Sequence, residues 1–136
     1  MRFFFYGTLL DPDVRRIVVG RDIALAAATL SGWRRLGVVG RHFPMIERDA
    51  TASVAGVVTE SLGPGDVARL RHYEGDGYHL VAVAVRDEGG AGIGASVFAP
   101  PDGRFVGAGE WTLADWQRDH RDAVLGRLRA YEWPCG

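Results

Sequence analysis

The sequence predicts an α+β fold: a small mixed β-barrel, or a strongly curved sheet, with helices packed around it. Three observations lead to this expectation. Short apolar strand patterns recur along the chain, helical patterns are only local, and the chain contains 19 glycines, some of which interrupt the strand patterns. The 136 residues show no repeat, linker or low-complexity tract, so we expect one domain over residues 1–136, large enough to bury a core without disulfides or metals.

Composition narrows the function classes. A net charge of -1 gives no electrostatic reason to expect binding to nucleic acid or an anionic membrane. All sixteen basic residues are arginine, which excludes Schiff-base chemistry and a phosphate-loop lysine. The single cysteine, Cys135, provides no disulfide framework, and we expect no nucleophilic role for it near a chain end. No apolar run has the length of a signal peptide or a membrane span, so a cytoplasmic location is expected.

The N-terminal segment predicts a strand, a turn and a helix. Residues 2–6 form a compact aromatic run typical of a buried strand. Asp11 is a good N-cap, Pro12 suits the first helical position, and Gly20 ends the pattern. The connecting turn contains Tyr6, Gly7, Thr8 and Leu9. Backbone amides in a turn that faces a helix start can bind an anion, although a plain strand-to-helix connection explains the same pattern.

The central and later strands follow from apolar runs between glycines. Residues 24–39, broken by Gly32 and Gly37, predict one long bent strand or two strands joined by a turn. A loop is expected at residues 43–46, where Phe43 and Pro44 either line a pocket or cover the core. Further strands are predicted at 52–59, 77–86 and 93–99, the last two as a hairpin. The continuous apolar pattern of 77–86 predicts a strand covered on both faces.

A helix predicted over residues 63–75 contains the clearest candidate for a catalytic residue. Val67 and Leu70 define its buried face, and helical spacing places Glu74 on that face. Burial and the negative end of the helix dipole both raise the pKa of an unpaired carboxyl, which is how a glutamate becomes a general base near neutral pH. The alternative is a Glu74 that turns to solvent or pairs with Arg71 or a distant arginine.

The C-terminal region predicts one helix over residues 113–131, starting at a capping box of Thr112 and Asp115. His120 falls on its apolar stripe and is expected to be a packed, hydrogen-bonded group rather than a ligand. The stripe consists of Leu113, Trp116, Val124, Leu128 and Tyr131. Trp111, Trp116 and Trp133 are expected to be packing residues.

Several familiar sites are missing. The glycines of 89–94 do not fit the dinucleotide-binding pattern and lie between strands rather than before a helix. The four histidines do not have the spacing of metal ligands, and no G-x-S-x-G nucleophile elbow occurs. What remains is a small enclosed fold with an amide-rich turn and one inward glutamate.

These motifs together resemble the gamma-glutamylcyclotransferase-like family. The resemblance is carried by Phe5-Tyr6-Gly7-Thr8-Leu9 near the start, by Tyr73-Glu74-Gly75-Asp76-Gly77-Tyr78 about seventy residues later, and by the valine-rich strand that follows. The Phe43-Pro44 loop, the strand around Gly56 and the tryptophan-bearing C-terminal region also fit, so the similarity spans most of the chain.

The resemblance implies a mixed β-barrel in which the Tyr6–Leu9 turn binds a γ-glutamyl compound and Glu74 transfers protons. In the family reaction the α-amine attacks its own γ-carbonyl, giving 5-oxoproline and a free amine or amino acid, without metal, nucleotide or covalent intermediate. Tyr78 is either a substrate-binding hydroxyl or a packing residue. Two other functions stay open: a barrel that binds a small molecule without catalysis, and a partner-interaction domain. The sequence indicates neither the leaving group nor the oligomeric state.

Overall fold

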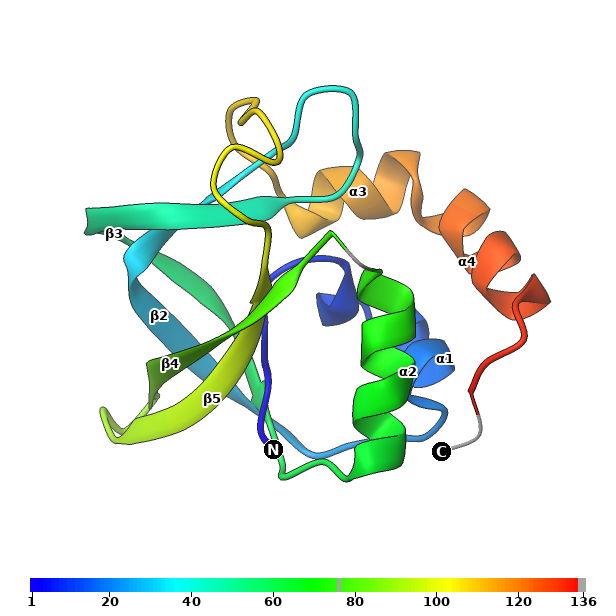
Figure 1. The fold of residues 1–136 in the computed structure, drawn as a ribbon, viewed down its shortest axis with the longest axis horizontal. Helices are drawn as coiled ribbons and strands as arrows, with labels where there is room; N and C mark the ends of the chain where they lie inside the picture. Colours follow the sequence, from blue (N-terminus) through cyan, green and yellow to red (C-terminus); the bar gives the residue numbers. More distant parts are fainter. Residues whose placement is uncertain (76, 135–136) are drawn as a thin grey trace.

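A five-stranded antiparallel sheet and four α-helices make up residues 1–75 and 77–134, which are the residues that the structure, a computed structural model, describes (Figure 1). Asp76 and Cys135 lie outside these ranges, so the expectation for Cys135 is not tested. The strand order is β1-β3-β2-β4-β5. The strands are β1 (Phe4–Phe5), β2 (Leu25–Leu36), β3 (Met45–Thr59), β4 (His79–Asp87) and β5 (Gly92–Ala99).

The hairpin of β2 and β3 is the longest part of the sheet. β2 is one bent strand, and its register with β3 shifts between Ser31 and Trp33, where Gly32 has a φ of 85°. That left-handed backbone favours glycine and produces the bend. The predicted loop at 43–46 is present only at Phe43 and Pro44, and the strand predicted from residue 52 begins earlier, because β3 starts at Met45. Glu47 and Arg48 pair with Arg34 and Trp33 of β2, whereas residues 49–52 have no partner in this register. Pairing with β2 therefore accounts for the first polar positions of the strand.

The hairpin of β4 and β5 was predicted correctly, but the burial of β4 was not. Val85 is buried, whereas Leu80, Val81 and Val83 are only partly buried. β4 pairs with β2 in the sheet at two positions, Ala28 with Asp87 and Thr29 with Arg86. The two hairpins therefore diverge from a short seam, and the helices cover only one side of the curled sheet (Figure 1). β4 thus has an open face, which a continuous apolar pattern does not reveal.

The sheet is curled but not closed, so of the two predicted forms, a small barrel or a strongly curved sheet, the curved sheet is confirmed. β1 pairs with β3, and the N-terminal segment approaches the opposite edge at a single parallel bridge between Phe3 and Ser96. Close packing at β1 requires Gly56, since a Cβ there would lie 2.2 Å from the Phe5 carbonyl oxygen. The curled α+β fold that the sequence predicted is otherwise present.

Alternating side chains of the N-terminal segment connect two hydrophobic clusters. Phe3 and Phe5 belong to a cluster shared with the helices, while Phe4 and Tyr6 belong to a cluster inside the curl of the sheet. All four side chains are buried. The short β1 strand is therefore surrounded on both faces, and this fixes the position of the turn that follows it.

The first two helices begin and end where the sequence predicted. They are α1 (Pro12–Val19) and α2 (Pro64–Glu74). Asp11 caps α1 and its carboxylate accepts hydrogen bonds from the backbone N–H groups of Asp13 and Val14. The same carboxylate, which is fully buried, also accepts from Gln117 and Arg121. Asp11 therefore ties the start of α1 to the C-terminal helices.

The C-terminal helix is broken. α3 (Leu113–Asp119) and α4 (Arg121–Ala130) meet at His120, whose φ of -130° and ψ of -19° interrupt the helix. His120 is exposed instead of packed, and its ring stacks on His42 with centroids 4.9 Å apart. Tyr131 lies beyond α4 and is 56% exposed. The prediction that His120 and Tyr131 lie on a buried stripe was therefore wrong. Trp111 and Trp116 are buried as predicted, and Trp133 packs against the core while partly buried.

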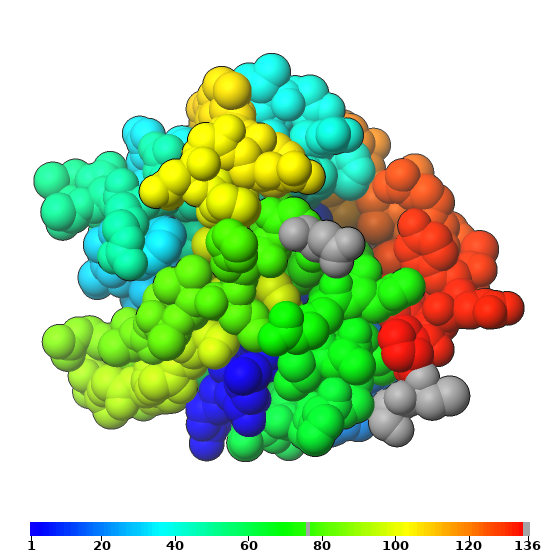
Figure 2. All heavy atoms as spheres, in the orientation of Figure 1, coloured from blue at the N-terminus to red at the C-terminus, as the bar shows by residue number. Residues whose placement is uncertain are grey.

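The segments around 37–44 and 100–109 lie side by side next to the helices (Figure 2). Gly37 and Gly109 share a backbone hydrogen bond of 2.8 Å, and Val38 bridges to Gly107.

Helices long and apolar enough to cross a membrane were not found among residues 1–75 and 77–134.

Candidate active site

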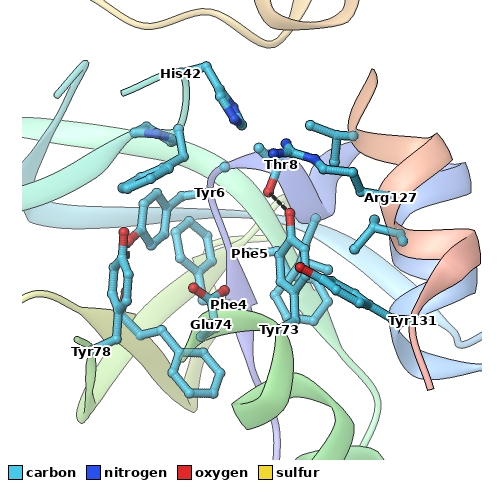
Figure 3. Close-up of a pocket in the computed structure, with 17 residues that line it drawn as sticks. Phe4, Phe5, Tyr6, Thr8, His42, Tyr73, Glu74, Tyr78, Arg127 and Tyr131 are labelled. Carbon is cyan, nitrogen blue, oxygen red and sulfur yellow. Dashed lines mark hydrogen bonds between the residues drawn. The ribbon is translucent and has the colours of Figure 1, made fainter. Parts of the chain in front are cut away.

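A cavity of about 280 Å³ opens between the start of the chain, the end of α2 and α4 (Figure 3). All six residues predicted for the site line it: Tyr6, Gly7, Thr8, Leu9, Glu74 and Tyr78. Phe43 and Pro44 also line it, and Phe43 packs against a small hydrophobic cluster as well, so both possibilities left open for this loop hold. The remaining lining residues are Phe4, Phe5, His42, Tyr73, Phe98, Val124, Arg127, Leu128 and Tyr131.

Glu74 is held at the cavity by the end of α2. Leu70, one turn earlier, is fully buried, and Gly75 ends the helix with a φ of 77°. Figure 3 shows Glu74 pointing from the helix end into the space between Tyr73 and Tyr78. In the described part of the chain no arginine lies within ion-pair distance of its carboxylate. Burial without a compensating cation raises the pKa of Glu74 from 4.5 to about 8.

The Tyr6–Leu9 turn supplies backbone N–H donors. Thr8–Leu10 form a short 3-10 helix, in which Leu10 donates to the Gly7 carbonyl. The N–H groups of Gly7, Thr8 and Leu9, by contrast, donate to no acceptor within residues 1–75 and 77–134. A helix start leaves such donors free, and three of them in succession can bind an anionic oxygen.

Gly7 allows the turn to pack closely against the Phe43-Pro44 loop. A Cβ at Gly7 would lie 2.8 Å from Cγ of Pro44, which is closer than side chains approach one another. The φ of Gly7 is -122°, outside the left-handed region, and the close approach of Pro44 is the reason for glycine that the structure shows. The loop therefore forms a wall against the turn.

Tyr73 connects the two halves of the site and was not predicted as a site residue. Its hydroxyl hydrogen-bonds the Thr8 hydroxyl at 2.5 Å, and either group can be the donor. Burial raises the pKa of Tyr73, so its hydroxyl keeps the proton at neutral pH. The signal was available in the sequence, since Tyr73 precedes Glu74 and lies three residues after Leu70 on α2.

The other two tyrosines differ in their bonding. The Tyr6 hydroxyl donates a hydrogen bond of 2.7 Å to the Phe98 carbonyl, and burial, with a further contribution from Glu74, raises the pKa of Tyr6. Tyr78 packs against Phe43 with ring centroids 6.4 Å apart. Its pKa is also raised, by burial first and by Glu74 second. Tyr78 therefore lines the cavity with a neutral hydroxyl, whereas Tyr6 is already bonded to the protein.

His42 is a wall residue that no sequence pattern singles out. Its carbonyl accepts from the indole N–H of Trp111 at 2.9 Å, and its Nδ1 accepts from that of Trp116 at 3.2 Å. Burial, and then the charges of His120 and Arg127, lower the pKa of His42. A neutral imidazole is the form that accepts a hydrogen bond at Nδ1.

The charges of the cavity are unevenly placed. Glu74 is the carboxylate among the lining residues, and Figure 3 shows Arg127 extending from α4 toward Thr8. Arg127 and Tyr131 were not predicted for the site, because the uninterrupted helix that we expected placed Tyr131 in the core. Groups of three or more histidine, cysteine, aspartate or glutamate side chains suited to a metal were not found within residues 1–75 and 77–134. The arrangement offers one proton-transfer group, free amide donors and one cation.

Comparison with known proteins gives consistent matches. The family model described as "Gamma-glutamyl cyclotransferase, AIG2-like" matches residues 3–118. "AIG2-like protein A" of Arabidopsis thaliana is 30% identical over 128 residues, covering 90% of this chain and 75% of that protein. "AIG2-like protein C" of the same plant is 30% identical over 133 residues, covering 95% and 77%. A solved structure titled "Gamma-glutamyl cyclotransferase" superposes with a TM-score of 0.69 at 16% identity, covering 96% of this chain and 87% of that one, which shows a common fold.

Proposed function

Because this chain belongs to the gamma-glutamyl cyclotransferase, AIG2-like family, we propose that it is an enzyme that converts a γ-glutamyl compound into 5-oxoproline and a free amine or amino acid. The α-amine of the glutamyl group attacks its own γ-carbonyl carbon, and the bond from that carbon to the leaving nitrogen breaks. The small molecule is both nucleophile and electrophile. The protein has to fold it, exclude competing water and move protons.

The cavity supports this task by its size and its donors. A volume of about 280 Å³ accommodates a glutamyl group together with part of what is attached to it. Ring closure within one molecule gains about 7–11 kcal/mol when the reacting atoms are well oriented. In the proposal the free N–H groups of Gly7, Thr8 and Leu9 bind either the substrate carboxylate or the oxyanion that develops on the γ-carbonyl oxygen.

Glu74 carries the proton transfers in this proposal. Ionised Glu74 takes a proton from the α-ammonium, and the neutral amine then adds to the γ-carbonyl carbon. When the tetrahedral intermediate collapses, Glu74 returns a proton to the leaving nitrogen. The ring nitrogen still carries one proton more than the lactam needs, and this proton also passes through Glu74 to the released amine. Glu74 therefore ends ionised, as it began, and the products are 5-oxoproline and an ammonium ion. A pKa of about 8 suits this role, because the carboxylate is basic enough to accept a proton and acidic enough to return it.

The single observation that carries the proposal is the position of Glu74. An unpaired carboxylate with a raised pKa lies in the same cavity as three free backbone donors. Tyr78 is proposed as a further substrate-binding group, because its neutral hydroxyl lines that cavity.

The test is the release of 5-oxoproline from γ-glutamyl amino acids, glutathione and γ-glutamyl amines. The wild-type protein is expected to release it from at least one of these compounds, and Glu74→Gln is expected to lose turnover while keeping its fold. Glu88→Gln, at an exposed position in the turn after β4, is the matched control and is expected to behave like the wild type. A Glu74→Gln variant that retains most of its activity would remove Glu74 from the mechanism. A folded wild-type protein that binds 5-oxoproline without turning over any compound would indicate the non-catalytic binding function instead.

A further inference from the structure

Arg127 is a cation at the cavity wall that the reaction described above does not use. It lies on α4, lines the cavity and is exposed. Within residues 1–75 and 77–134 no carboxylate lies within ion-pair distance of its guanidinium. Arg121, on the same helix, contrasts with it, since Arg121 pairs with both Asp11 and Asp13. A guanidinium that faces a binding cavity without a protein partner is suited to bind an anionic group of a ligand.

The inner part of the cavity already has donors for the glutamyl half of a substrate. The three free amides of the turn lie in the cavity wall that also holds Glu74. One of the anionic oxygens of that half, on the carboxylate or on the γ-carbonyl, can bind there. Arg127 and Tyr131 instead belong to the side of the wall that is exposed to solvent, from which the Arg127 side chain extends toward Thr8. The attached group varies in size from one γ-glutamyl compound to another, so it has to project toward that side.

The wall around Arg127 also lies outside the part of the chain that the family model covers. The match ends at residue 118, whereas four residues of the wall follow it: Val124, Arg127, Leu128 and Tyr131. The turn and Glu74 fall within the match. The part of the wall that follows residue 118 is therefore where we look for a preference for one leaving group over another.

We propose that Arg127 is a specificity-determining residue that binds a carboxylate on the leaving group. Its guanidinium favours γ-glutamyl amino acids and peptides, whose leaving nitrogen is bonded to a carbon near a carboxylate. It disfavours γ-glutamyl amines that carry a second positive charge. This inference rests on the proposed cyclotransferase function, and it concerns only the half of the substrate that departs.

The experiment compares two substrates that differ at one group. γ-Glutamyl-L-alanine has a leaving-group carboxylate, and γ-glutamyl-L-alaninamide has a neutral amide in its place. Release of 5-oxoproline from both substrates is followed with the wild type, Arg127→Gln and Arg129→Gln. The kcat/KM is determined for each protein with each substrate. Arg129 is an exposed arginine of the same helix that does not line the cavity, so its variant controls for the lost charge. For an exposed charge-assisted contact we expect the wild type to prefer the acid by about five- to twentyfold.

Arg127→Gln is expected to lower that preference to about one by reducing kcat/KM for the acid alone, while Arg129→Gln keeps it. Two results would overturn the inference: equal kcat/KM for the two substrates with the wild type, or an equal loss for both in Arg127→Gln, which would place Arg127 at the glutamyl half. Calorimetric affinities for the same pair, measured with Glu74→Gln and with Glu74→Gln/Arg127→Gln, separate this inference from the proposed reaction. An affinity preference that needs Arg127, without turnover by the wild type, would reject the reaction and keep the carboxylate site. Turnover by the wild type without any such preference would keep the reaction and reject the carboxylate site.

Discussion

Replacing Glu74 by glutamine should stabilise the folded protein at alkaline pH. Burial raises the pKa of this carboxyl from 4.5 to about 8, so between these two values the folded state holds a proton that the unfolded state has released. The unfolded state then binds fewer protons, and the free energy of unfolding of the wild type falls as the pH rises through this window. Glutamine does not titrate, so the free energy of unfolding of Glu74→Gln does not fall in this way.

The structure bounds the size of the effect. Each unit of pKa corresponds to about 1.4 kcal/mol, so a rise from 4.5 to about 8 gives an upper limit of about 5 kcal/mol. Because the carboxylate of Glu74 borders an open cavity, water screens part of this destabilisation. Above pH 8 we expect Glu74→Gln to be more stable than the wild type by about 2–3 kcal/mol. Near pH 4.5 the two proteins should differ little, since the Glu74 carboxyl is then protonated in the folded state and only half ionised in the unfolded state.

The assay is urea unfolding followed by circular dichroism at intervals between pH 4.5 and 9, with Glu88→Gln as the control. The stability of Glu74→Gln relative to the wild type should grow with pH and level off above about 8, and that of Glu88→Gln should stay constant. A difference that does not change with pH would refute the argument that the carboxyl of Glu74 is held neutral by burial. A variant less stable than the wild type at pH 9 would show that the carboxylate has a stabilising partner.

Three further outcomes are expected. The kcat/KM for the proposed reaction should rise about tenfold per pH unit below pH 8 and level off above it, because the ionised Glu74 is the reactive form; a flat profile between pH 6 and 8 would contradict this. Gly7→Ala should lower stability by about 1–3 kcal/mol in thermal unfolding, because its Cβ would meet Pro44, whereas Gly94→Ala, which has open space, should not. Asp11→Ala should lower the free energy of unfolding by about 2–4 kcal/mol, since its buried carboxylate accepts four hydrogen bonds, and a loss below 1 kcal/mol would argue against that network.

Local chemistry was sufficient to predict the elements that carry Glu74 and the turn. The ends of α1 follow from Asp11 and Gly20, and the end of α2 follows from Gly75, because caps act within a few residues of the helix they end. The direction of Glu74 follows from its spacing to Leu70 on the same helix. These inferences need no knowledge of what lies across the cavity, which is why a single sequence supports them.

The parts that were missed depend on contacts between distant segments. Glu47 and Arg48 are part of β3 because they pair with β2, and the open face of β4 results from the divergence of the two hairpins. The break at His120 comes with a stacking contact to His42, which is far away in sequence. Because that break sets the direction of α4, the position of Arg127 at the cavity was not accessible from helical periodicity alone.

The geometry of the proposed site depends on one helix more than on any other element. Consecutive residues of α2 reach both of its parts: Glu74 is the proposed base, and Tyr73 hydrogen-bonds Thr8 in the amide turn. A shift of α2 would therefore move Glu74 and Tyr73 together. The distance between the proposed base and the residue that bonds the turn would stay the same. α4, by contrast, contributes wall residues without a hydrogen bond to the turn among those the structure describes. Reaction chemistry and leaving-group preference can then change separately, because they depend on different helices.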